Sequence, residues 1–152
     1  TNLYGIHDNF DLTSSHVLPA MMRKFHEAKE NNHAPVTLWG TGTPMREFLF
    51  VDDMAQAVVF ALENELPEYL YNVGTGEDLS IEELARSIQQ IVGHQGAIIW
   101  DSSKPDGTPR KWMDSSKMHQ LGWKHQVELI QGIEKTYDWF LANSQSIKEL
   151  KM

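Results

Sequence analysis

Hydrophobic residues recur at helical spacing early in the chain and predict a long helix there. The apolar positions of this stripe are Val17, Met21, Met22, Phe25 and Ala28. Either Ser14 or Ser15 can cap the start of the helix, and its first turn tolerates a proline. Because Pro35 prevents a helix from continuing, we expect this one to fade near Asn31.

Two further helices are predicted in the middle of the chain. Met54–Asn64 is apolar on most of its faces, so we expect a well buried helix that Asp52 caps. Ser80 and Glu83 have the spacing of a capping box, which predicts a helix over Ile81–Val92 that stops at the following glycine.

The end of the chain is also helical in pattern. We expect a short helix near Ser116–Leu121 and a long one over Val127–Asn143, followed by a polar tail, Ser144–Met152, that frays. The predicted buried face of the long helix consists of Val127, Ile130, Ile133, Tyr137, Phe140 and Leu141.

Short apolar runs between the helices predict strands. They are Asn2–Tyr4, Val36–Trp39, Phe48–Val51, Tyr69–Val73 and Ala97–Trp100. Because strands alternate with helices, the fold class is α/β. No repeat, low-complexity tract or linker divides the 152 residues.

Composition excludes several function classes. A formal net charge of −8 argues against a general nucleic-acid binder, and no apolar run approaches the roughly 20 residues that span a bilayer. Without cysteine there can be no disulfide, thiolate metal site or cysteine nucleophile, which agrees with a cytoplasmic protein. The histidines other than His16 have no partner at i+3 or i+4 that would suggest a metal site, so we expect none.

The segment Gly42-Thr-Pro-Met-Arg-Glu-Phe-Leu-Phe-Val-Asp-Asp53 says most about function. It places Arg46 in a loop before a short strand and a helix start, where a fixed cation suits a phosphate or carboxylate. The alternative is a structural ion pair of Arg46 with Asp52 or Asp53, and both roles could hold together.

A second loop, Lys104-Pro-Asp-Gly-Thr-Pro-Arg-Lys111, is stiffened by two prolines and turned by a glycine. Asp106 can accept hydrogen bonds from sugar or base donors. The cations Lys104, Arg110 and Lys111 form either a specific anion site or an ordinary solvated loop.

Three more side chains are candidates. His16 can exchange a proton near neutral pH, although a histidine in a first helical turn is more often a cap or a surface residue. Lys24 lies two turns further, roughly 12 Å along the helix axis, and either binds a diphosphate or faces solvent. Trp39 belongs to the core or forms an aromatic shelf for a base or sugar.

Two glycine pairs are not nucleotide-binding fingerprints. Gly40-Thr-Gly42 and Gly74-Thr-Gly76 have Met45 and Leu79 where the third glycine would be required, so we interpret them as turns at strand ends. The chain also has no Tyr-x-x-x-Lys pair.

The two loops, together with Asn2-Leu-Tyr-Gly5 and Ser15-His-Val-Leu-Pro-Ala20, resemble the GDP-L-fucose synthase family of the extended short-chain dehydrogenase/reductase superfamily. The resemblance runs from Asn2 to about Phe140. It implies an enzyme that epimerises and then reduces GDP-4-keto-6-deoxymannose with NADPH in the cytoplasm. It also implies that residues 1–152 are the C-terminal part of a Rossmann-like enzyme, mostly its smaller substrate-binding domain.

The resemblance assigns roles to individual residues. His16 is the catalytic acid and base for epimerisation, and the residues beside the cofactor are Thr1, Asn2, Leu3 and His16. The GDP-sugar contacts are Asn2, Lys24, Trp39, Arg46, Asp106 and Lys111. NADP(H) would be bound mainly by a dinucleotide-binding part upstream, which would also supply the proton-donating tyrosine and the helices of a homodimer. We therefore expect residues 1–152 alone to be inactive.

Three departures from the family pattern concern the pocket and one surface loop. Lys24 replaces an arginine of many relatives and loses its bidentate fork. Phe50 stands where a histidine is expected, and Glu63–Tyr71 is shorter than usual. The alternative functions are another nucleotide-sugar epimerase or dehydratase of the superfamily and a non-catalytic module that retains the pocket. A glycine fingerprint and a Tyr-x-x-x-Lys pair upstream would indicate an enzyme.

Overall fold

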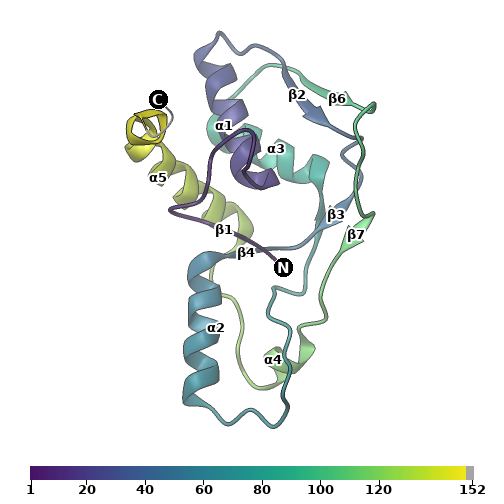
Figure 1. Ribbon diagram of the computed structural model, residues 1–152, viewed down its shortest axis with the longest axis vertical. Helices are drawn as coiled ribbons and strands as arrows, with labels where there is room; N and C mark the ends of the chain where they lie inside the picture. Colours follow the sequence, from purple (N-terminus) through teal and green to yellow (C-terminus); the bar gives the residue numbers. More distant parts are fainter. Residues whose placement is uncertain (150–152) are drawn as a thin grey trace.

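Helices and short strands alternate along the chain, as the apolar pattern predicts (Figure 1). A computed structural model describes residues 1–149. Its helices are α1 (Val17–Glu30), α2 (Val51–Glu63), α3 (Ile81–Val92), α4 (Ser116–Gln120) and α5 (Leu129–Glu149). Its strands are β1 (Asn2–Tyr4), β2 (Val36–Trp39), β3 (Met45–Arg46), β4 (Phe48–Phe50), β5 (Leu79–Ser80), β6 (Ile98–Asp101) and β7 (Arg110–Lys111).

The strands form three small sheets. β1 pairs with β4, and β2 pairs with β6, both in parallel. β3 lies between antiparallel β5 and parallel β7. Only Glu47 separates β3 from β4, so one continuous stretch of chain belongs to two sheets.

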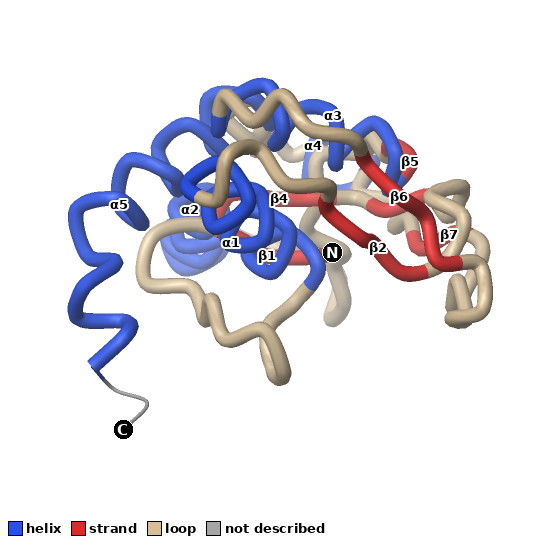
Figure 2. The backbone as a smooth tube through the Cα atoms, turned by 90° about the horizontal axis from the view of Figure 1, so that it is seen from above, coloured by secondary structure: helices blue, strands red, loops and turns tan. Residues whose placement is uncertain are grey.

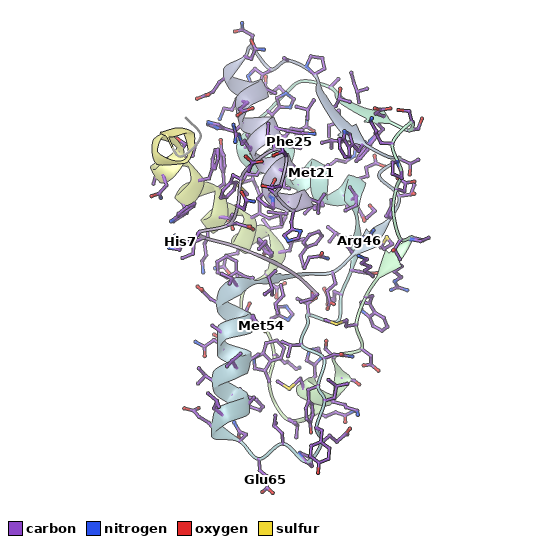
Figure 3. The ribbon with its side chains drawn as sticks, in the orientation of Figure 1. His7, Met21, Phe25, Arg46, Met54 and Glu65 are labelled. Carbon is purple, nitrogen blue, oxygen red and sulfur yellow. The ribbon has the colours of Figure 1, made fainter. Side chains whose placement is uncertain are left out.

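The main core lies where α1, α3 and α5 meet. α3 packs against both of the other helices, and α1 also packs against β2. Figure 3 shows Met21 and Phe25 on α1 near the centre of this upper part of the molecule. Both side chains are buried, as are Leu84 and Ile88 of α3. Viewed from above, α1, α2 and α5 lie toward one end, and β2, β6 and β7 lie toward the other (Figure 2).

α2 is less buried than its apolar composition suggests. Only Asp53 and Ala57 among its residues are buried, and Leu62 is 82% exposed. The helix extends away from the main core (Figure 1) and contacts a smaller cluster that includes Met118 and Trp123. The prediction of a well buried helix is therefore wrong, because only one of its apolar faces is covered within the described residues.

Helix starts agree only in part with the predicted caps. In α3, Ser80 accepts from the Glu83 main-chain N–H, and the Glu83 carboxylate accepts from the Ser80 main-chain N–H, so the capping box is confirmed. The predicted serine cap of α1 is wrong, because His16 occupies the N-cap position and makes no side-chain capping bond. Asp52 does not cap α2 either, because that helix begins at Val51 and its N-cap is Phe50.

Two other predictions about elements need correction. Residues 69–73 form no strand, and Tyr69 and Leu70 are exposed, because no strand of the described chain pairs with them. The last helix continues to Glu149 through most of the tail that was expected to fray, and the rest of that tail lies outside the described residues. Ile130 and Leu141, predicted on its buried face, are about half exposed.

The α1–α3–α5 core generates a stability prediction. Ile88→Ala should lower the free energy of unfolding by about 2–5 kcal/mol, because the fully buried side chain leaves a cavity among three helices. Ile130→Ala is the matched control on an exposed helical position and should cost about 0.5 kcal/mol. Urea unfolding followed by circular dichroism measures both, and equal losses would contradict the placement of the core.

Candidate functional site

A cleft of about 350 Å³ opens between α1, the end of β2 and strand β3. Its lining side chains include Lys24, Trp39, Arg46 and Asp106. These four residues come from widely separated parts of the sequence, and all four were predicted to contact a substrate. The fold therefore brings most of the predicted substrate contacts to one place.

Arg46 is held on β3 and has no acidic partner in the described part of the chain. Its Nη1 donates to the carbonyl of Met45 at 2.7 Å. Within residues 1–149 it forms no ion pair, and Asp53 instead accepts the main-chain N–H groups of Gln126 and Val127 at 2.8 and 3.1 Å. The predicted alternative of a structural ion pair with Asp52 or Asp53 is therefore wrong.

Lys24 is the second cation of the cleft. Its Nζ donates to the carbonyl of Thr37 at 3.3 Å, and no ion pair neutralises it in the described part of the chain. Two positive charges without carboxylate partners thus line one hollow of a protein whose net charge is −8. Such an arrangement suits a ligand that carries more than one negative charge.

Asp106 fastens the second loop against the turn that follows β2. Its Oδ1 accepts the Thr41 N–H at 2.6 Å, and its Oδ2 accepts the Thr41 hydroxyl at 2.8 Å. Gly40 has a φ of +79°, and a Cβ at this position would lie 2.2 Å from the Asp106 carboxylate. Gly40 is therefore required both for its conformation and for this close approach.

Trp39 is 68% exposed at the rim of the cleft, which excludes a core position. The Nζ of Lys104 lies 5.6 Å from the centroid of its ring. A cation at this distance is attracted to an aromatic face, so Lys104 helps to hold the ring in place. The exposed ring offers a flat surface on which a base or a sugar can stack.

The basic cluster of the second loop is divided by the fold. Arg110 forms a bidentate ion pair with Asp78, with N–O distances of 2.6 and 3.0 Å. This pairing lowers the pKa of the Asp78 carboxyl group. The guanidinium of Arg110 also lies over the ring of Trp112. Lys111 is in register with Arg46, so these two residues share a face of the sheet, although Lys111 does not line the cleft. Arg110 is therefore occupied, whereas Lys111 lies beside Arg46 at the exposed edge.

Three of the four predicted cofactor contacts, Thr1, Asn2 and Leu3, lie apart from the cleft, on β1 or just before it. The side-chain amide of Asn2 donates to the carbonyl of Glu47 at 2.8 Å, and the Thr1 hydroxyl donates to the same oxygen at 3.2 Å. Leu3 is 39% exposed and lines a smaller separate hollow. β1 is nevertheless adjacent to the Arg46 strand, because it pairs with β4.

His16 is exposed at the N-terminus of α1 and does not line the cleft, although its neighbours Ser15 and Val17 do. Burial raises the pKa of Asp8, and the hydrogen bond that its carboxylate accepts from the Asn9 N–H partly offsets this rise. His7, in the same loop as Asp8, lies on the opposite side of the molecule from Arg46 (Figure 3). Because Ser15 and Val17 line the cleft and His16 does not, His16 lies at the edge of the cleft rather than inside it.

Several residues that line the cleft, or that hold one of its lining side chains, were not predicted from the sequence. Thr41 holds Asp106, and its position inside a Gly-Thr-Gly turn is the one signal that could have identified it. Thr13 and Leu12 line the cleft from an irregular loop that carries no pattern. Phe50, one of the departures from the family pattern, is buried against Tyr4 and does not line the cleft.

Residues 1–149 contain no group of three or more acidic or histidine side chains that could hold a metal ion. Within the same range, no helix is long and apolar enough to cross a membrane.

Residues 1–74 match the NAD dependent epimerase/dehydratase family. The chain is 54% identical to a probable GDP-L-fucose synthase 1 of Oryza sativa subsp. japonica, covering 98% of this chain and 45% of the relative. It is 51% identical to the GDP-L-fucose synthase of Escherichia coli K12, covering 97% and 49%. The chain therefore spans about half the length of the curated relatives it matches.

A solved structure likewise matches nearly the whole of this chain over about half of its own length. A GDP-L-fucose synthetase from Naegleria fowleri, bound to NADP, superposes with a TM-score of 0.89 at 31% identity, covering 96% of this chain and 44% of that one. The α/β fold is thus that of Rossmann-like sugar-nucleotide enzymes. Residues 1–74 are thus similar to the NAD dependent epimerase/dehydratase family, and the fold of the chain is similar to that of a GDP-L-fucose synthetase.

Proposed function

We propose that the cleft binds the nucleoside diphosphate of a GDP-sugar. The observation that carries this proposal is the pair of cations, Arg46 and Lys24, that face one cleft and have no carboxylate partner among the described residues. A diphosphate supplies the missing negative charge, and Arg46 can bind two of its oxygens through its planar fork. The exposed ring of Trp39 is then available to the base or the sugar.

The whole protein would act as a GDP-L-fucose synthase that epimerises and then reduces GDP-4-keto-6-deoxymannose. The names of the relatives from rice and Escherichia coli support this assignment. His16 would move protons at the carbons beside the keto group, because an exposed imidazole at the edge of the cleft can reach a sugar that extends from the diphosphate. Asn2 would hold the sugar with its amide, and Asp106 and Lys111 would contact the nucleotide.

NADP(H) would supply the hydride for the reduction. The chain contains no complete dinucleotide fingerprint. Its residues can therefore contact only one part of such a cofactor. We propose that Thr1, Asn2 and Leu3, at the edge formed by β1, lie beside the nicotinamide together with His16. A dinucleotide-binding part upstream would hold the rest of the cofactor and form the contacts of a homodimer.

Replacing Arg46 tests the proposed diphosphate site. Arg46→Ala should weaken GDP binding roughly ten- to hundred-fold, because a charge-assisted phosphate contact is lost. Arg46→Lys should recover only part of the affinity. Titration calorimetry with GDP and, separately, with NADPH measures the effect in the full-length protein, and NADPH affinity should hardly change.

Arg110→Ala is the matched control, because this arginine lies on the neighbouring strand but is already paired with Asp78. It should leave GDP affinity within about three-fold, since no phosphate contact is removed. Equal losses of GDP and NADPH affinity in Arg46→Ala, or an equal loss of GDP affinity in Arg110→Ala, would count against the assignment.

Replacing His16 tests the proposed chemistry separately from binding. In the full-length enzyme, His16→Asn should slow epimerisation by about 10²–10⁴-fold while GDP-sugar affinity changes only a few-fold. Deuterium incorporation from solvent at the carbons beside the keto group is the direct measurement. Exchange at the wild-type rate would mean that His16 only begins the helix. A wild-type protein that binds GDP but catalyses no exchange would favour the non-catalytic module.

A further inference from the structure

Glu47 is a buried acidic residue at the junction of β3 and β4. Its exposed fraction is 0%, although it follows Arg46 at the edge of the cleft. A carboxylate is costly to bury unless it is hydrogen-bonded, so its position calls for an explanation in terms of its partners. The hydrogen-bond partners of its carboxylate lie on one side of the junction, and those of its main-chain carbonyl lie on the other.

On one side, the carboxylate holds the turn that leads into β5. Its Oε1 accepts the Gly76 N–H at 2.8 Å and the Thr75 hydroxyl at 3.3 Å. A Cβ on Gly74 would lie 2.4 Å from the same oxygen, so the turn closes tightly around the carboxylate. β5 begins three residues later and pairs with Arg46 through Leu79.

On the other side, the main-chain carbonyl of Glu47 collects three donors from the start of the chain. The Asn2 side-chain amide donates at 2.8 Å, the Asn2 N–H at 3.1 Å and the Thr1 hydroxyl at 3.2 Å. The direction of this carbonyl therefore sets the orientation of the Asn2 amide.

We infer that Glu47 is a positioning residue that fixes Asn2 and Arg46 relative to each other. Its side chain anchors the junction against the Gly74–Gly76 turn, and the anchored main chain then orients Asn2 through its carbonyl and directs Arg46 into the cleft. This inference rests on the proposed function, in which Asn2 contacts the sugar and Arg46 contacts the diphosphate.

Glu47→Ala, Glu47→Asp and Glu47→Gln in the full-length enzyme separate positioning from simple stability. Glu47→Ala should lower kcat and raise KM for the GDP-sugar, with kcat/KM falling about 100-fold, because displacements near 1 Å at a reacting group have effects of this size. Glu47→Gln should stay within about five-fold of the wild type, because it keeps an acceptor oxygen and Oε2 has no hydrogen-bond partner within residues 1–149. Glu47→Asp, which is one methylene shorter, should fall between them.

Asp53→Ala is the matched control for burial. Asp53 is also a buried carboxylate with two hydrogen-bond donors, here the main-chain N–H groups of Gln126 and Val127, but it does not line the cleft. It should lower the melting temperature and leave kcat/KM within about three-fold when assayed well below that temperature, because its partners are remote from the cleft.

Equal losses of kcat/KM in Glu47→Ala and Asp53→Ala would overturn the inference, as would a Glu47→Ala enzyme with wild-type kinetics. If Glu47→Ala does not fold, the comparison of Glu47→Asp with Glu47→Gln decides, and an aspartate variant as active as the glutamine variant contradicts the inference. A wild-type enzyme without turnover of GDP-4-keto-6-deoxymannose would instead refute the proposed function. In that event GDP affinity alone tests the inference. A Glu47→Asp protein with unchanged GDP affinity would then contradict the claim that Glu47 positions Arg46.

Discussion

The main-chain pairing of residues 45–50 is the constraint on which the rest of the structure depends. β3 pairs with β5 and β7, and β4 pairs with β1, although only one residue separates β3 from β4. The first pairings carry Arg46 to the cleft, and the second buries Phe48, Leu49 and Phe50. A shift of this segment by one residue would turn each of its side chains to the opposite face of the sheet and would remove the cation from the site.

The charge distribution of the cleft follows from how the nearby carboxylates are engaged. Asp53 is occupied by main-chain donors at the loop before α5, and Asp78 is paired with Arg110. Asp106 enters the cleft but is fastened to Thr41. Arg46 and Lys24, which have no acidic partner within the described residues, are therefore available to an anionic ligand even though the protein is acidic.

Local signals were predictable from the sequence, and features that depend on distant partners were not. The capping box of α3 was predicted correctly, because Ser80 and Glu83 satisfy each other within one turn. The expected strand over residues 69–73 is absent, because apolar alternation cannot reveal whether a pairing strand exists. The motifs identified four cleft residues. They could not show that Arg46 has no acidic partner in the part of the chain that the structure describes, or that Glu47 is fully buried, because both facts depend on residues that are distant in sequence.

The central claim is that the cleft between α1, β2 and β3 is a diphosphate site. The most direct measurement is a crystal structure of the full-length protein with GDP bound. The diphosphate oxygens should lie within hydrogen-bonding distance of the Arg46 guanidinium and the Lys24 ammonium, with the remainder of the ligand extending toward Trp39. A GDP molecule bound elsewhere, with this cleft filled only by water and Arg46 paired to a carboxylate, would contradict the claim.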